Sequence, residues 1–366
     1  MEIAAQQSER QSGSRNPALL AWPWGGAALA LLLVSTVLAW WQEPLAVPPN
    51  RAPQVWSFFK PIELHPYRRL LSVSSELRAL SFNPDGRHGW AVGEGGLILA
   101  TRDGGQNWTL RLSTTDQGLR AVTFEPQGRR GWAVGEGDVI LATRDGGQNW
   151  APQPGTRDQG LPAVTVQSQS RLDRAVGGRN AIQASGDGAK VGLVQTSQRA
   201  DSLFYSGAFL VDALSGWVVG AGGAILATRD GGQSWQAQST YKQRHLRAVA
   251  FAPDGRRGWA VGDYGTIRAT SDAGQNWTLQ SSNTAHHLHA LAMTPDGQRA
   301  WAVGDNGIIV ATTTGGKRWD EQTSGTQRLL RGVHFAADGQ RGWAVGEGGS
   351  LLLTGDEEGP AINGTK

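Results

Sequence analysis

A segment of 42 residues recurs along this chain, and it constrains the fold more than any other feature. The steps between successive copies of its marker are 42, 42, 43, 42, 42 and 42 residues. A period of this length indicates stacked supersecondary units, none of which buries its own apolar face alone. Seven near-equal units predict a closed ring. The marker is Trp-Ala-Val-Gly or a close variant, and its copies begin at Trp90, Trp132, Arg174, Trp217, Trp259, Trp301 and Trp343.

Each copy contains four short segments with the pattern of antiparallel strands. In the second copy, the alternating residues 119–124 precede a turn with Pro and Gly, then the marker, then the apolar run 139–143. Pro and Gly are disfavoured inside a strand ladder, so they separate the strands. Four strands in each of seven repeats are typical of an all-β, seven-bladed β-propeller. The last repeat lacks a fourth strand, and we expect residues 67–73 to supply it and so to remove an open sheet edge.

A turn motif before the fourth strand resembles the Asp box of sialidase-type (BNR) propellers. Its first copy, from Thr101 to Trp108, reads Thr-Arg-Asp-Gly-Gly-Gln-Asn-Trp. A short carboxylate accepts hydrogen bonds from turn N–H groups, glycine supplies positive φ, and Trp covers the hairpin. A fifth copy has Thr314 in place of the acid. We interpret the carboxylates as structural and not catalytic, namely those of Asp103, Asp145, Asp230 and Asp272.

Composition excludes several classes of function. The net charge is only +3 and no basic tract occurs, which argues against a nucleic-acid-binding protein. Cysteine is absent, so disulfides, thiolate metal sites and a lipid-modified cysteine are excluded. The three histidines in 286–289 have no acidic or cysteine partner at ligand spacing. We therefore expect neither a metal nor a cofactor.

The beginning of the chain predicts export. Residues 17–41 carry no charge and are long enough for a transmembrane signal anchor, which would leave residues 1–16 in the cytoplasm. A cleaved signal peptide ending at Ala39 is the alternative. Either reading places the propeller outside the cytoplasm. Residues 42–66 contain six prolines and predict a stiff stem, followed by the propeller at 67–358 and a tail at 359–366.

Most repeats have a cationic residue twelve positions before the marker, where the innermost strand of the blade is expected to begin. We expect these side chains to ring the mouth of the central tunnel. An acid stands four residues after the marker in the same repeats; if Phe124 lies opposite Trp132, Arg120 faces Glu136, which predicts a salt bridge within each blade. Guanidinium groups at a concave mouth also bind carboxylates. The candidate partner-binding residues are Arg78, Arg120, Tyr205, Arg247, His289 and Arg331.

The whole repeat, from Trp-Ala-Val-Gly through Asp-Gly-Gly to the following Trp, resembles the photosystem II assembly and stability factor family over residues 67–358. The resemblance implies a monomeric, non-enzymatic propeller in the thylakoid lumen or periplasm that binds membrane-protein subunits. It also implies an arginine-rich binding patch. Cyanobacterial members are typically lipid-anchored through cysteine, which this chain lacks. The positions that correspond to the patch are Arg78, Arg120, Arg247 and Arg331.

Two other functions remain open. A generic periplasmic interaction propeller in an envelope complex fits the same features. A glycoside hydrolase of sialidase-like fold would need a tyrosine nucleophile with a paired glutamate. Tyr205 is the only tyrosine at the mouth, and Ala221 occupies its partner position. The mouth acids recur in five repeats, whereas a catalytic pair should be unique, so we expect no enzyme.

Overall fold

The computed structural model separates the chain into two compact units, residues 1–52 and residues 53–366. Everything described below belongs to the second unit. The described residues are 56–58, 75–153, 163–165, 173–176, 181–185, 191–195, 203–210, 212, 214–238 and 244–354.

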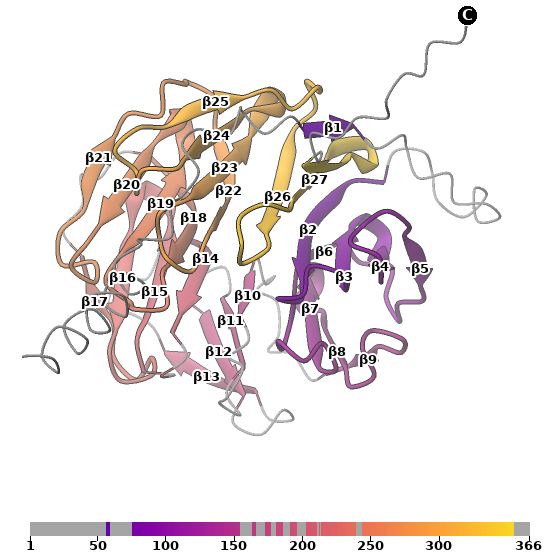
Figure 1. Ribbon diagram of the computed structural model, residues 1–366. Coiled ribbons are helices and arrows are strands. Elements are labelled where there is room, and N and C mark those ends of the chain that lie inside the picture. The colour runs from indigo at the N-terminus through magenta and orange to yellow at the C-terminus, as the bar shows by residue number, and fades with distance from the viewer. Residues whose placement is uncertain are drawn as a thin grey trace, which may run out of the picture. The chain divides into compact units, whose positions relative to one another are not determined.

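The second unit is built from four-stranded antiparallel sheets (Figure 1). In all but one of the described sheets, the four strands are consecutive and pair in chain order. Seven such sheets occur among the described residues. The first three repeats contain β2 (Leu77–Phe82), β3 (Gly89–Gly93), β4 (Ile98–Thr101), β5 (Thr109–Arg111), β6 (Leu119–Phe124), β7 (Gly131–Gly135), β8 (Ile140–Thr143), β9 (Ala151–Pro152), β10 (Ala163–Thr165), β11 (Asp173–Val176), β12 (Ala181–Ser185) and β13 (Val191–Gln195). The next three contain β14 (Phe204–Phe209), β15 (Gly216–Gly220), β16 (Ile225–Thr228), β17 (Gln236–Ala237), β18 (Leu246–Phe251), β19 (Gly258–Gly262), β20 (Ile267–Thr270), β21 (Thr278–Gln280), β22 (Leu288–Met293), β23 (Ala300–Gly304), β24 (Ile309–Thr312) and β25 (Asp320–Gln322). The last sheet contains β26 (Leu330–Phe335), β27 (Gly342–Gly346), β28 (Leu351–Thr354) and the N-terminal β1 (Trp56–Phe58).

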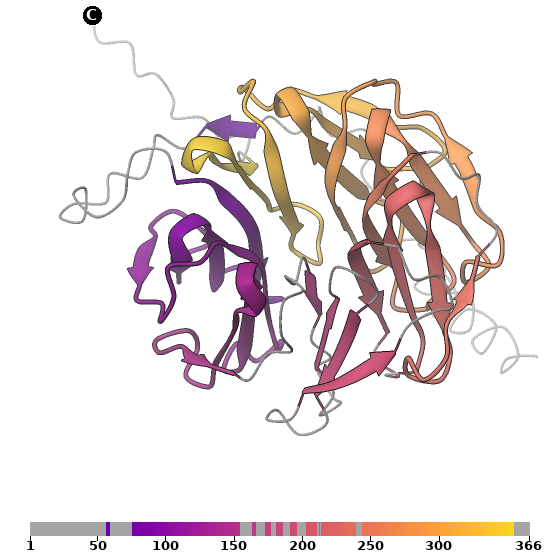
Figure 2. The ribbon, with the colours of Figure 1, turned by 180° about the vertical axis from the view of Figure 1, so that it is seen from behind.

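The first strand of each sheet lies innermost and contacts the first strand of the next sheet, from β2 and β6 through to β26 and back to β2. Figures 1 and 2 show the sheets side by side around a common centre. In six sheets a short 3-10 helix joins the second and third strands. These helices are η1 (Glu94–Gly96), η2 (Glu136–Asp138), η3 (Ala221–Gly223), η4 (Asp263–Gly265), η5 (Asp305–Gly307) and η6 (Glu347–Gly349).

At a junction between two blades, three aromatic rings pack against one another. Trp90, the marker residue of the first blade, stacks on Phe124 of the second blade with ring centroids 3.5 Å apart. Trp150, the last residue of the second Asp box, meets the same Phe124 edge-on at 5.8 Å. Trp343 and Trp108 enclose Phe82 in the same way, which joins the last blade to the first. The two repeated tryptophans therefore form the core between blades, as their large apolar area favours.

The N-terminal strand that closes the last blade is not the predicted one. β1 pairs antiparallel with β28, so Trp56 lies opposite Thr354 and Phe58 opposite Leu352. These residues belong to the predicted stem 42–66, whereas the expected closing strand 67–73 lies outside the described residues. The alignment of 67–73 with the other fourth strands was a local similarity, but closure requires backbone pairing with the free edge of β28.

The prediction of seven near-equal blades behind a transmembrane helix also needs correction. Six blades share the complete pattern of four strands and a 3-10 turn. The third repeat forms the divergent sheet β10–β13, of which only the strand backbones are described. Its sequence replaces the marker tryptophan by Arg174, which removes one ring of the stack between blades. The structure thus describes six regular blades and one divergent sheet.

No helix in the described part of the chain is long and apolar enough to cross a membrane. The predicted anchor, residues 17–41, lies outside the described residues, as do residues 1–16 and the tail 359–366.

Candidate functional site

A β-bulge interrupts the first strand of each regular blade at its second residue. In the second blade, Leu119 pairs with Gly135 and Ala121 with Val134, so Arg120 has no partner in the ladder. Phe124 lies opposite Gly131 and not opposite Trp132, so the predicted register was wrong by one residue. The bulged residues are Arg78, Arg120, Tyr205, Arg247, His289 and Arg331.

The close approach of two backbone segments accompanies the bulge. A Cβ atom on Gly262, the last residue of β19, would lie 2.0 Å from the carbonyl oxygen of His245. The next N–H group, that of Asp263, donates to the same oxygen at 3.0 Å. Only glycine fits where the marker ends, and the extra residue between Leu246 and Ala248 is turned out of the ladder. The glycine of the marker therefore helps to place the bulged side chain.

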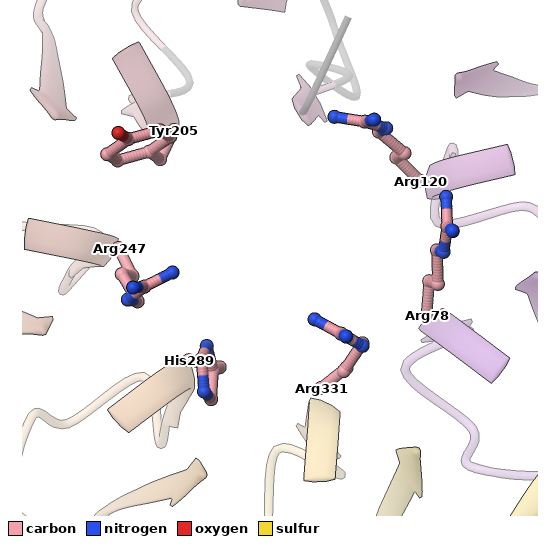
Figure 3. Close-up of a pocket in the computed structure, with 6 residues that line it drawn as sticks. All are labelled: Arg78, Arg120, Tyr205, Arg247, His289 and Arg331. Carbon is pink, nitrogen blue, oxygen red and sulfur yellow. The ribbon is translucent and has the colours of Figure 1, made fainter. Parts of the chain in front are cut away.

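The six bulged residues line one pocket, which we call the mouth pocket, with a volume of about 390 Å³. Figure 3 shows their side chains around an open centre, with Arg78, Arg120 and Arg331 along one side and Tyr205, Arg247 and His289 along the other. All six candidate residues of the sequence analysis are thus brought together. The corresponding residue of the third repeat, Pro162, lies outside the described residues.

Ion pairs within single blades surround the mouth pocket, as predicted. Arg120 Nη2 lies 3.2 Å from Glu136 Oε1, and Arg78 Nη2 lies 3.1 Å from Glu94 Oε1. In the fifth blade, Arg247 Nε lies 2.6 Å from an oxygen of Asp263. The same-blade prediction is confirmed for these pairs. A fourth pair joins His289 Nε2 to Asp305 Oδ1 at 2.6 Å.

Other ion pairs cross between blades, which the sequence analysis missed. Arg78 Nη1 lies 2.7 Å from Glu136 Oε1, although Glu136 belongs to the next blade. Arg331 pairs with Glu76 at the start of the first blade, not with Glu347 of its own blade as predicted. Glu76 is also 3.6 Å from Arg78 Nε. The one sign of this contact in the sequence is that Glu76 is the single acidic residue at its position among the seven repeats.

These contacts form a continuous row of alternating charges from Arg331 to Arg120. The hydrogen bond from Arg78 is the main cause that holds the pKa of Glu136 below its usual value, and the one from Arg120 adds to it. Glu136 therefore stays ionised and holds both guanidinium groups. The side chain of Arg120 is nevertheless 45% exposed, and Glu136 is its one ion-pair partner among the described residues.

The histidine cluster is divided between two acids. His287 Nδ1 lies 3.0 Å from Asp263 Oδ1 and 3.3 Å from the backbone nitrogen of Tyr264, while His289 contacts Asp305. Burial lowers the pKa of His289, against the opposing effect of its hydrogen bond with Asp305. The imidazoles therefore do not converge on one point. Among the described residues, no group of three or more histidines and acids is placed to hold a metal ion.

The Asp-box carboxylates lie at the opposite ends of the strands from the bulges. Asp145 Oδ1 accepts from the Thr143 hydroxyl at 2.8 Å and from the Asn149 N–H at 3.0 Å. The hydrogen bond from the Asn149 backbone is the largest effect on the Asp145 carboxyl, and it lowers the pKa of that group to about 2. Every carboxylate oxygen is thus used within its own turn. The same contacts to a threonine hydroxyl and to the fourth following residue occur at Asp103, Asp230 and Asp272.

Solved structures show the same fold. The chain is similar to YCF48 bound to a D1 peptide, with a TM-score of 0.66 and 24% identity over 84% of this chain and 98% of that one. YCF48 from Cyanidioschyzon merolae matches with a TM-score of 0.65 and 21% identity over 83% of this chain and all of the other. The WD40 propeller domain of Doa1 matches with a TM-score of 0.67 but only 12% identity, over 84% and 99% of the two chains. No curated protein sequence matches the chain.

The family assignment comes from the sequence of the repeats. The family model described as photosynthesis system II assembly factor YCF48 matches residues 65–191 and 189–284, which together exceed half of the chain. The matched residues include the first five repeats with their markers and four Asp boxes. The chain belongs to the YCF48 family of photosystem II assembly factors.

Proposed function

We propose that this protein assists photosystem II assembly by binding a segment of D1 in the mouth pocket, outside the cytoplasm in the thylakoid lumen or periplasm. The observation that carries the proposal is that four of the six bulges direct an arginine into one pocket. Family membership and the solved YCF48 bound to a D1 peptide support the choice of partner.

The geometry of the arginines suits an incoming carboxylate. A guanidinium group has five N–H donors, and the acids of the pocket occupy only part of them. Arg120 donates to Glu136 through Nη2, and Arg247 donates to Asp263 through Nε. These fixed contacts orient the planar groups while leaving further donors toward the pocket, where a ligand carboxylate could accept two parallel hydrogen bonds.

We further propose that the site binds without catalysis. The acids that surround it, Glu94, Glu136, Asp263 and Asp305, each contact a cation or histidine. The ring of Tyr205 meets His245 edge-on at 6.1 Å, and Ala221 occupies the position of its potential acid. Turnover of aryl glycosides that disappears in Glu136→Gln would contradict the non-enzymatic proposal.

Binding is tested with the full chain in mild detergent and synthetic peptides that cover the extramembrane segments of D1. We expect at least one peptide to bind. We expect Arg120→Glu to lower the affinity for that peptide about tenfold, because a repulsive charge replaces a hydrogen-bond donor. The matched control is Arg144→Glu, since Arg144 is exposed and lies at the Asp-box end of the strands. Absence of binding by the unaltered protein, or equal loss in both variants, would contradict the proposal.

The compartment is tested separately with a reporter fused after Lys366. Alkaline phosphatase folds into an active enzyme only outside the cytoplasm because it needs disulfides. We expect activity from this fusion and none from the equivalent β-galactosidase fusion. The reverse pattern would contradict the proposed compartment without affecting the binding test.

A further inference from the structure

Tyr264 occupies a backbone position that disfavours it. The second residue of each 3-10 turn has a left-handed conformation, with φ between 52° and 64°. Glycine fills this position in four of the six described turns and asparagine in one, as expected for left-handed backbone. Tyr264 has φ 52° and ψ 45°, so an aromatic residue is held where its blade would fold more easily with glycine. Such an outlier points to a role outside the fold itself.

The side chain of Tyr264 contributes little to packing, since it is 58% exposed. Its backbone contact does not need the ring either. The Tyr264 N–H faces His287 Nδ1 at 3.3 Å, and in the preceding blade Gly222 makes the same contact with His245 at 3.0 Å. The phenol ring is therefore additional to what the turn requires.

Two neighbours nevertheless hold the ring in place. The guanidinium carbon of Arg244 lies 5.3 Å from the ring centroid, and Arg244 Nη1 donates to the Tyr264 carbonyl at 3.2 Å. The imidazole of His287 lies 4.7 Å from the same ring. Among the described residues, Arg244 has no carboxylate partner. An ordered, exposed aromatic ring beside an available guanidinium group has the composition of an interface anchor.

This anchor adjoins the mouth pocket. Asp263, the residue before Tyr264, is buried and accepts hydrogen bonds from Arg247 of the pocket at 2.6 Å and contacts His287 at 3.0 Å. Figure 3 shows Arg247 next to His289 at the edge of the pocket. The Tyr264 ring is therefore connected to Arg247 of the pocket through His287 and Asp263.

We infer that Tyr264 and Arg244 form a second subsite, which selects D1 segments carrying an aromatic or large aliphatic side chain near the carboxylate that enters the mouth pocket. The inference rests on the proposed function. It adds an apolar contact with the D1 segment to the contact between the arginines and its carboxylate. The apolar side chain lies on the exposed part of the Tyr264 ring. Arg244 donates to a carbonyl or carboxylate oxygen of the same segment.

The test compares Tyr264→Gly with the unaltered protein, using the tightest-binding D1 peptide and a version whose aromatic and large aliphatic residues are alanine. We expect Tyr264→Gly to bind the first peptide about tenfold more weakly than the unaltered protein does. For the second peptide, we expect the affinity of Tyr264→Gly to be no lower than that of the unaltered protein. Its urea midpoint should be unchanged or higher, because glycine relieves the left-handed strain. The matched control, Asn306→Gly in the next turn, should keep full affinity.

Equal affinity of Tyr264→Gly and the unaltered protein for the first peptide would overturn the subsite while leaving the proposed function intact. A fall in affinity that accompanies a fall in the urea midpoint would assign Tyr264 a structural role and also overturn it. If the unaltered protein binds no D1 peptide, the proposed function fails, and the subsite fails with it.

Discussion

Nη1 of Arg78 lies 2.7 Å from Oε1 of Glu136, although the two residues belong to successive blades. The same carboxylate oxygen receives Nη2 of Arg120 at 3.2 Å. One acid thus holds two arginines of the mouth pocket and ties two blades together. Arg331 and Glu76 make the corresponding contact across the junction between the last blade and the first.

The contact between Arg78 and Glu136 should be measurable as a coupling energy. In a double-mutant cycle of Arg78→Ala and Glu136→Gln, we expect a coupling of about 0.5–1 kcal/mol in the free energy of unfolding, since Glu136 is partly exposed and screened. The pKa of Glu136 is lowered mainly by Arg78, so this stabilisation is present above the unfolded pKa and is lost as the pH falls below it. Urea unfolding at neutral and acidic pH measures both effects. Zero coupling at neutral pH would contradict the cross-blade contact.

The Asp boxes should stabilise the propeller through their turns. We expect Asp145→Ala to lower the free energy of unfolding by about 1 kcal/mol, because three N–H groups and a hydroxyl lose their acceptor. The pKa of Asp145 is about 2 in the folded protein, so its contribution is complete above the ordinary value of 3.8 and disappears as the pH falls toward 2. Urea denaturation followed by tryptophan fluorescence measures the change. A variant as stable as the unaltered protein would show that the turn holds without its carboxylate.

The fifth box offers the reverse experiment. Thr314 replaces the acid; its hydroxyl accepts from the Arg318 N–H at 3.2 Å and lies 3.4 Å from the Thr312 hydroxyl. We expect Thr314→Asp to raise the free energy of unfolding by about 0.5 kcal/mol, because a carboxylate accepts the same backbone hydrogen bond more strongly. A lower unfolding midpoint in Thr314→Asp would show that this turn has lost the geometry of the other boxes.

The junction between the last and first blades should depend on Trp343. This side chain is fully buried, stacks on Phe82 at 3.8 Å and donates from Nε1 to the Gly104 carbonyl at 2.8 Å. We expect Trp343→Ala to cost about 3–5 kcal/mol, measured by chemical denaturation. Trp90→Ala provides the control, because Trp90 makes the same stack on Phe124 within the ring. A much smaller cost for Trp343→Ala than for Trp90→Ala would mean that ring closure adds little stability.

His334 should make the propeller sensitive to mild acid. It lies in β26 beside the stacked rings of Phe82 and Trp343, with its own ring centroid 5.9 Å and 6.1 Å from theirs, and burial lowers its pKa to about 4. The unfolded chain binds this proton near pH 6.5, so stability falls as the pH drops from 6.5 to 4, by at most about 3 kcal/mol. His334→Thr, which carries the residue found at the equivalent position Thr123, should lose less stability over that range. Identical pH profiles for the two proteins would contradict this assignment.

The sequence predicted the strands, the Asp-box turns and the six residues of the mouth pocket, because each depends on local periodicity repeated along the chain. The bulge that presents Arg120 was not predictable from alternation alone. It depends on how closely the backbone after Gly135 approaches the start of β6, where a Cβ on this glycine would meet the Gly118 carbonyl at 2.1 Å.

The repeat by itself determined which residues are equivalent, and hence that Trp, Gly and Asp at recurring positions build the blades. Only the tertiary structure decided what differs between equivalent positions. Strand pairing, not alignment, assigned the closing strand to Trp56–Phe58. The distance between blades, and not the spacing along the chain, decided that Arg331 reaches Glu76. The physical reason is that a repeat encodes contacts within a unit, whereas long side chains and free sheet edges find partners according to how the units are arranged in space.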